Sequence, residues 1–399
     1  MILRFLVLWE KLRSSYWFVP SLMAILATAL AFGMAKVDEG YGAKFVRELG
    51  WIYTGGPDGA RSVLSAIASS VMGVAGTTFS ITIAVLSLTS GQYGPRLLRS
   101  FMRDTGNQIV LGTFTATFLY CLLVLRTIRG TEQTTYVPHF SVTTGVLLAI
   151  FSVGVLIYFV HHTAESIQVS HIIEEVGKDA DEMVGRLFPE GIGQTGGDES
   201  LPGGDPGTVC ADEIGYVQSI DQAALLRFAR KHGLVIRIEV RPGDYVLPEM
   251  QLLSVWPKAG DHGDSLKGVF NYGRQRTTAQ DSQFAFLQLA EIAVRALSPG
   301  INDPFTAMSC LDRITASMCL LAVRGWPDSR RFDEAGALRV VARAYEPWDL
   351  VQAGYGHILD SAKDSPAVME KLRESLATLM LRTENPRLLA ALQRMRSQM

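Results

Sequence analysis

The stretch VLSAIASSVMGVAGTTFSITIAVLSLTS, residues 63–90, decides the fold. It carries no charged side chain, and a helix of about 20 apolar residues suffices to cross the hydrocarbon core of a bilayer. A pattern of small residues runs through it and would cover about 45 Å as a helix, at about 1.5 Å per residue. The sequence therefore predicts a membrane-spanning helix that tilts, kinks near Gly73 and Gly76, or projects beyond the bilayer.

Three other segments are long and apolar enough to span a bilayer, at about residues 17–35, 107–126 and 140–160. Charged residues are nearly absent within them, which disfavours the alternative of four buried helices in a large soluble core. The chain of 399 residues has a mean hydropathy of +0.19, which suggests a membrane part and a soluble part. We expect a multi-pass α-helical membrane protein with four transmembrane helices within residues 1–165, followed by a C-terminal α+β cytoplasmic domain.

Basic residues suggest an orientation. The flank before the first span and the loop between the second and third spans carry Arg4, Lys11, Arg13, Arg96, Arg99 and Arg103. Short loops rich in Lys and Arg remain in the cytoplasm. The loop 36–61 is also basic, but acidic residues balance it. Four spans return the chain to its starting side, so both termini are expected in the cytoplasm.

Small residues recur at steps of three and four along the second span. They include Ser62, Ser65, Ser69, Gly73, Gly76, Ser80 and Ser87. Such spacing places them on one helix face. Three interpretations stay open: tight packing inside one protomer, a pore or pathway ringed by several copies, and a seam between copies that does not conduct.

Metal and cofactor sites are not expected. His161 and His162 close the fourth span, but neighbouring residues point about 100° apart on a helix and chelate poorly. We interpret them as interfacial histidines. Four cysteines are present, and none forms a CxxC motif or a metal-ligand spacing with histidine. Neither a metal nor a cofactor is predicted.

Beyond the spans, the pattern predicts a helix over 166–188 that leaves the membrane, and then a flexible linker over 189–208 that is rich in Gly, Pro and acid. Residues 209–258 are expected to form a small αβ unit. Its PGDYV hairpin is similar to that of lipoyl and biotinyl carrier domains, but the target lysine is missing. We therefore expect a packing module without swinging-arm chemistry.

Residues 277–399 are predicted to form a helical bundle. Two of its segments, 281–297 and about 304–323, are apolar enough to suggest further spans. Charges near the middle of each make that costly in a bilayer. They are interpreted as a helix hairpin buried in a soluble bundle or an oligomer interface.

The hairpin turn ALSPGINDPFTA, residues 296–307, has two interpretations. In the first, Ser298-Pro299-Gly300 ends one helix, while Asp303 caps the next, with Pro304 in its first position. In the second, polar groups converge near the turn as a regulatory ligand or gating site. The candidates are Arg276, Asp281, Glu291, Arg295, Asn302 and Asp303.

No catalytic motif is present: the sequence has no P-loop, no HExxH and no nucleophile elbow. An enzyme is therefore not expected. The net charge of −2 gives no reason to expect a nucleic-acid partner.

Three motifs carry a resemblance to a known family. They are FSITIAVLSLTSGQYGPRLLRSFMRD (79–104), LGTFTATFLYCLLVLR (111–126) and ALSPGINDPFTA (296–307). Together they resemble a bacterial family of predicted membrane proteins, domain of unknown function 2254, over nearly the whole chain. The resemblance implies a multi-pass protein of the bacterial inner membrane with a cytoplasmic C-terminal region. It implies no activity.

The leading expectation is a homo-oligomeric channel or transport-type protein, in which the second span lines the symmetry axis and the cytoplasmic domain assembles or gates it. Its partners would be the lipid bilayer, further copies of itself, and a small ion or solute. The first alternative is a non-conducting membrane scaffold or sensor whose cytoplasmic domain binds a partner or ligand. The second is a membrane enzyme with an unrecognised site.

Overall fold

A computed structural model describes the chain except for residues 1–16, 47–52, 94–103, 132–133, 189–200 and 259–262. The chain divides into two compact units, Met1–Gln168 and Val169–Met399. Most of the predicted linker 189–208 lies outside the described residues. Its last two residues lie in a strand, because strand β3 begins at Gly207.

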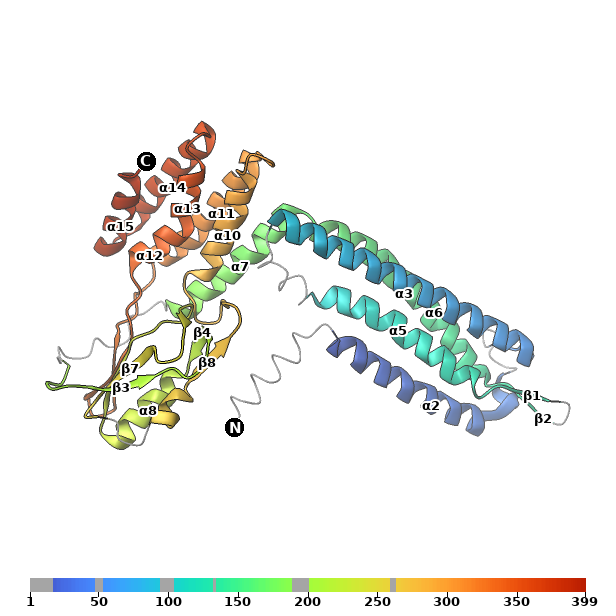
Figure 1. Cartoon of the computed structure of the whole chain (residues 1–399). Helices are drawn as coiled ribbons and strands as arrows, with labels where there is room; N and C mark the ends of the chain where they lie inside the picture. The colour runs from blue at the N-terminus through green and yellow to red at the C-terminus, as the bar shows by residue number, and fades with distance from the viewer. Residues whose placement is uncertain (1–16, 47–52, 94–103, 132–133, 189–200, 259–262) are drawn as a thin grey trace. The chain divides into compact units, whose positions relative to one another are not determined.

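The first unit is a bundle of long helices (Figure 1). Its elements are α2 (Phe18–Val46), α3 (Pro57–Tyr93), α5 (Thr105–Leu125), the hairpin of β1 (Arg129–Thr131) and β2 (Thr134–Tyr136), and α6 (His139–Ser166). Helix α5 packs against α2, α3 and α6, so it forms the middle of the bundle. Tyr120 on α5 is fully buried and donates to the carbonyl oxygen of Ser141 at 3.0 Å.

Each predicted span coincides with one of these helices to within one residue at the start of α2 and the end of α5, and the helices extend beyond the other predicted bounds. Among the described residues, five helices are long and apolar enough to cross a membrane. Four belong to the first unit, and the fifth is α11 (Pro304–Ala322) in the second unit. The architecture is therefore several apolar helices followed by a region of helices and sheets.

The second unit begins with α7 (Val169–Leu187) and continues with mixed structure. Its strands are β3 (Gly207–Cys210), β4 (Gly215–Ile220), β5 (Val235–Ile238), β6 (Tyr245–Val246), β7 (Gln251–Trp256), β8 (Phe270–Gly273), β9 (Arg330–Phe332) and β10 (Leu338–Val341). Its other helices are α8 (Gln222–His232), α9 (Gly263–Lys267), α10 (Phe284–Ala296), α11, α12 (Pro347–Val351), α13 (His357–Ser361), α14 (Pro366–Arg382) and α15 (Pro386–Arg396). A π-helical turn over Gln352–Gly356 joins α12 to α13.

The strands form two sheets. One has five strands in the order β3-β7-β5-β10-β9, and the other has three in the order β6-β4-β8. Only the β10–β5 pair is parallel in the first of them. Their shared core consists mainly of β-branched and leucine side chains, such as Val217, Ile236 and Val255.

Two expectations are corrected here. The region 277–399 is not purely helical, because β9 and β10 lie within it and β10 pairs with β5. The PGDYV segment is not a hairpin, since β5 and β6 belong to different sheets. Backbone hydrogen bonds explain this: Gly243 donates to the carbonyl of Val217, and Val217 donates to that of Asp244, which draws the turn onto β4.

Candidate functional site

Helix α3 has two distinct faces within the first unit. One face is buried and packs on α5 and α6; its residues include Ala60, Leu64, Ala68, Val71, Ala75, Thr78, Thr82 and Val85. The small residues predicted from the sequence lie elsewhere. Ser62, Ser65, Ser69, Gly73, Gly76, Ser80 and Ser87 are all exposed, and we refer to them as the small-residue face.

The exposure of this face bears on the first interpretation, tight packing inside one protomer. A Cβ atom added at Gly73 or Gly76 would meet no other group within 4 Å. The described residues of the first unit therefore do not pack closely on the small-residue face, which disfavours the interpretation of tight packing inside one protomer. The periodic pattern revealed the face, but which side of α3 contacts α5 and α6 depends on the tertiary structure.

Several hydroxyl groups on α3 are satisfied by the helix itself. Ser80 donates to the carbonyl oxygen of Gly76 at 2.9 Å, and Thr77 donates to that of Gly73 at 3.1 Å. Such bonds let hydroxyl groups lie in an apolar surrounding without an unmet donor. The middle of the small-residue face can therefore contact lipid, another helix or water.

A carboxylate of α2 fixes the beginning of α6. Asp38 accepts from the backbone N–H groups of Phe140 and Ser141 at 2.8 and 3.0 Å, and from the Ser141 hydroxyl at 2.5 Å. Free N–H groups at a helix start attract negative charge. His139 also contacts the Tyr53 carbonyl at 2.7 Å through Nδ1. The sequence analysis missed this cluster, although an acid so near an apolar span is a usable signal.

The other end of α6 is joined to the beginning of α5. Nε2 of His162 lies 2.6 Å from Oδ2 of Asp104, and each side chain is 21% exposed. Asp104 also caps α5 by accepting from the Gly106 N–H at 2.8 Å. His161 instead faces outward and pairs with Glu165 at 3.3 Å. His162 thus has a structural partner that sequence spacing did not reveal.

Within the described part of the chain, no three His, Cys, Asp or Glu side chains gather closely enough to hold a metal ion. A second buried polar contact between α5 and α6, besides that of Tyr120 with Ser141, is a hydrogen bond between the hydroxyls of Thr117 and Ser152, at 3.1 Å. This contact is of a kind that stabilises helix pairs in lipid.

The hairpin turn in the second unit follows its first interpretation. Asp303 caps α11: its carboxylate accepts from the N–H of Thr306 at 3.1 Å and from the Thr306 hydroxyl at 2.6 Å. These bonds lower the pKa of Asp303. Asn302 takes a left-handed conformation with φ of 49°, which Asn tolerates better than most residues. The predicted cap and Pro304 at the helix start are confirmed.

The six candidate ligand residues do not converge. Arg276 and Asp281 precede α10, whereas Asn302 and Asp303 follow it. Helix α10 has 13 residues, so the two groups lie about 20 Å apart at about 1.5 Å per residue. The remaining two candidates, Glu291 and Arg295, pair on α10 itself at 3.5 Å.

Arg276 and Asp281 form a structural ion pair. The guanidinium donates twice to the carboxylate, at 2.6 and 2.9 Å, and Asp281 is only 2% exposed. Gly243 lies against this pair with φ of +99°, and a Cβ there would lie 2.4 Å from Oδ2 of Asp281. Only glycine fits such a conformation and such an approach. The pair thus anchors the turn after β5 to the start of α10.

A second ion pair joins α7 to α11. Nη2 of Arg313 lies 2.5 Å from Oδ2 of Asp181, and the Ser317 hydroxyl donates to Oδ1 of Asp181 at 2.6 Å. Gly177 makes room, because a Cβ there would lie 1.9 Å from Nε of Arg313. The sequence shows a charge, Arg313, near the middle of the segment 304–323 but gives no sign of its partner on α7.

Comparison with known proteins agrees with this architecture. A family model described as "Predicted membrane protein", domain of unknown function 2254, matches residues 13–378. A Mycobacterium tuberculosis protein described as uncharacterized is 32% identical over 341 residues, which cover 82% of this chain and 64% of the relative. An uncharacterized Mycobacterium bovis protein is 31% identical with the same coverage.

The matched region thus spans slightly less than two thirds of these relatives' own length. No solved structure matches the chain. The family match covers most of the chain, including the helices of the first unit and the hairpin of α10 and α11. The chain therefore belongs to the family of predicted membrane proteins called domain of unknown function 2254.

Proposed function

We propose that the protein assembles as a homo-oligomer in the bacterial inner membrane through the small-residue face of α3, and that this face lines a path for an ion or small solute. One observation carries the proposal: the small-residue face is exposed from Ser62 to Ser87, while the opposite face packs inside the protomer.

Lipid chemistry makes this face a candidate for helix contact. Lipid chains are as apolar as leucine, so helices in a bilayer associate through close packing and hydrogen bonds. Glycine and serine allow the backbones of two helices to approach closely. Since no described residue outside α3 lies within 4 Å of a Cβ atom built on Gly73 or Gly76, a second copy of α3 is the partner we assign to them.

A path along the axis would be polar but uncharged. The small-residue face offers hydroxyl groups and exposed glycine backbone, and its residues carry no formal charge. Water and small solutes can exchange hydrogen bonds with such groups as they pass. The alternative is a non-conducting scaffold with the same oligomer. The bond from Ser80 to Gly76 favours it, because a satisfied hydroxyl needs no water.

Four spans are part of the proposal. Helix α11 is apolar enough to cross a membrane, but Arg313 lies near its middle and is bound to Asp181 of α7. Separating Arg313 from Asp181 and placing its charge in lipid would be costly. With α2, α3, α5 and α6 as the spans, both termini lie on the same side of the membrane, and the basic residues that flank the spans assign that side to the cytoplasm.

Labelling of single cysteines tests the topology. Thr54 precedes α3 and is exposed, and Leu381 near the end of α14 is 89% exposed. In a cysteine-free background, a membrane-impermeant thiol reagent added to spheroplasts should label Thr54→Cys and leave Leu381→Cys unlabelled. The reverse pattern, or labelling of both, would contradict the proposed arrangement.

Ion current through the purified protein in a planar bilayer tests conduction. We expect unitary current from the unaltered protein and its loss in Ser69→Trp, because the indole would fill the axis. Ser70→Trp is the matched control: Ser70 is also exposed but points about 100° away on the helix. Silence of the inserted, oligomeric protein over a range of voltage, salt, pH and membrane tension would favour the scaffold.

A further inference from the structure

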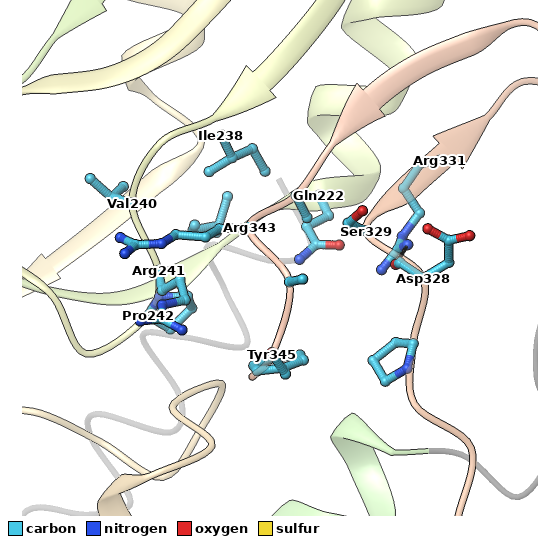
Figure 2. A pocket seen from close by; sticks show the side chains of 14 residues that line it. Gln222, Ile238, Val240, Arg241, Pro242, Asp328, Ser329, Arg331, Arg343 and Tyr345 are labelled. Atoms are coloured by element: carbon cyan, nitrogen blue, oxygen red, sulfur yellow. Dashed lines mark hydrogen bonds between the residues drawn. The ribbon is translucent and has the colours of Figure 1, made fainter. Parts of the chain in front are cut away.

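A pocket opens in the second unit where three segments distant in sequence meet (Figure 2). They are the turn after β5, the first turn of α8, and the residues on either side of the β9–β10 pair. About 420 Å³ of space free of protein atoms lies within this partly open pocket, a volume that includes open solvent.

Three arginines line this pocket: Arg241 from the turn after β5, Arg331 from β9 and Arg343 from the residues after β10. A single acid, Asp328, shares the lining with them. Its carboxylate already accepts from the backbone N–H of Arg330 at 2.9 Å. The lining therefore carries an excess of positive charge.

Two of these arginines have carboxylate partners from outside the lining. Arg241 donates to Asp349 at 2.7 Å and is 20% exposed, so it is well neutralised. Arg343 lies 3.6 Å from Asp244 and is 51% exposed, which makes its pairing loose. Exposed pairs of this length contribute little and exchange easily for another anion.

Arg331 is the least neutralised of the three. Its Nη1 donates to the backbone carbonyl oxygens of Asp328 and Arg330. Among the described residues it makes no ion pair with a carboxylate. A guanidinium has five N–H donors, so these bonds fix its orientation and leave its other donors for a ligand.

Neutral donors complete the lining. The Ser329 hydroxyl and the Gln222 carboxamide both border the pocket (Figure 2). Tyr345 lines it as well, and burial raises the pKa of this tyrosine, although the nearby Arg331 and Arg241 act in the opposite direction. The Tyr345 hydroxyl therefore remains protonated at neutral pH and can donate a hydrogen bond.

We propose that this pocket binds a phosphate-bearing anion, with Arg331 as its main charged contact and Arg343 as a second. The donors approach from separate segments of the chain, so they surround the ligand. A tetrahedral phosphate accepts hydrogen bonds in several directions, whereas a planar carboxylate accepts mainly in its own plane. The apolar part of the wall, including Ile238 and Val240, suits an organic group attached to the phosphate.

Phosphorus NMR titration of the full-length protein in zwitterionic detergent tests the site. Inorganic phosphate and glycerol 3-phosphate are the soluble probes, and acetate is the carboxylate competitor. We expect saturable line broadening that acetate does not displace at equal concentration. Two results would overturn the proposal. One is that neither the soluble phosphates nor phosphatidic acid bind; the other is that acetate at equal concentration displaces the phosphate.

Matched variants locate the binding. Arg331→Gln should weaken binding about tenfold or more, because a charge-assisted contact is lost. Since Arg331 also holds backbone carbonyls, Arg343→Gln serves as a second variant with less effect on folding and a smaller expected loss. Arg230→Gln is the control: Arg230 pairs with Glu334 on the surface, away from the lining. The proposal would be overturned if the affinity for phosphate were the same in all three variants, with Arg331→Gln folded. The phosphate would then bind elsewhere.

The source of the phosphate is decided by a parallel arm. The protein is placed in nanodiscs of phosphatidylcholine with or without phosphatidic acid, and glycerol 3-phosphate is added to each. Binding of glycerol 3-phosphate in both identifies a soluble ligand. Loss of glycerol 3-phosphate binding only in the nanodiscs that contain phosphatidic acid identifies a lipid headgroup. Either result supports the site.

Discussion

Helices α3 and α6 both belong to the first unit and both expose one face, but the two exposed faces differ in kind. The outward face of α6 consists of bulky apolar side chains, among them Leu147, Ile150, Phe151, Val153, Ile157 and Val160. Helix α3 exposes serine and glycine, with the bulky Met72, Phe79, Ile81, Ile83 and Leu88 among them. Bulky chains suit contact with lipid tails, whereas small residues suit contact with another helix. The difference teaches that exposure alone does not identify a lipid-facing surface.

The largest effect is expected from a charge on the α6 face. Ile150 is 64% exposed and near the helix centre, so Ile150→Arg should cost about 3 kcal/mol of membrane insertion. The matched control, Thr378→Arg, lies on the exposed surface of α14 in the second unit and should stay within about 0.5 kcal/mol. Insertion efficiency of the folded chain into membranes measures the first, and thermal unfolding the second. Normal insertion of Ile150→Arg would break the comparison, because the α6 face would then not contact lipid.

A larger side chain on the small-residue face should separate the protomers. Gly76→Leu would force the helices apart, and overpacking typically costs about 1–3 kcal/mol at each contact. Val153→Leu makes a change on the α6 face and should leave the oligomer intact. Light scattering in detergent reports the mass of both variants. The contrast between the faces fails if Gly76→Leu keeps the mass of the unaltered protein or if Val153→Leu loses it.

The packing of the second unit includes a partly buried ion pair, whereas the small-residue face of α3 carries no charge. Arg313→Met leaves Asp181 without its partner; because Arg313 is 15% and Asp181 32% exposed, solvent screening reduces the loss. We expect about 1–2 kcal/mol lower stability of the second unit. Arg373→Met, which breaks an exposed pair with Glu370, should change stability by less than about 0.5 kcal/mol. Equal unfolding temperatures of the two variants would show that the ion pair of Arg313 with Asp181 does not contribute to stability.

The cap of α11 should have the smallest effect. Asp303→Ala should cost about 1 kcal/mol, since the first turn loses an acceptor. The pKa of Asp303 is lower in the folded state than its ordinary value of 3.8, so the ionised form stabilises the fold. This contribution is present above pH 3.8 and is lost as the pH falls through the lower folded value.

Asp303→Asn sharpens that prediction. Asparagine can still accept from the Thr306 N–H, so most of the stability at neutral pH should remain. The acid-dependent part should disappear, because the group no longer titrates. Unfolding in denaturant at pH 7 and pH 3 measures both effects. An unchanged acid dependence in Asp303→Asn would assign it to other groups.

The local features of the fold could be predicted from the sequence. Apolar length located the four helices of the first unit, and turn chemistry located helix ends. Asp221 caps α8 by accepting from the N–H of Ala224, and Gly233 ends it with φ of +65°. Asn385 caps α15 in the same way as Asp303 caps α11. Ser365 precedes α14 at a position where serine is a favoured cap, but its side chain makes no capping hydrogen bond.

The features that could not be predicted from the sequence depend on contacts between distant segments. Strand β10 has only four residues, and it is stabilised by pairing with β5, about a hundred residues earlier. The pairs of Arg313 with Asp181 and of His162 with Asp104 likewise join separate helices. For the same reason, periodicity revealed the small-residue face but not its exposure, and the sequence left open whether the candidate ligand residues near the hairpin turn meet.

Disulfide cross-linking along α3 tests the central claim most directly. The native cysteines are replaced, and Ser69→Cys and Ser70→Cys are compared in native membranes under mild oxidation. Both positions are exposed, but only Ser69 belongs to the small-residue face. We predict that Ser69→Cys forms a cross-linked dimer of the full chain and that Ser70→Cys does not. No cross-link at Ser69, or equal cross-linking at both positions, would contradict assembly through this face.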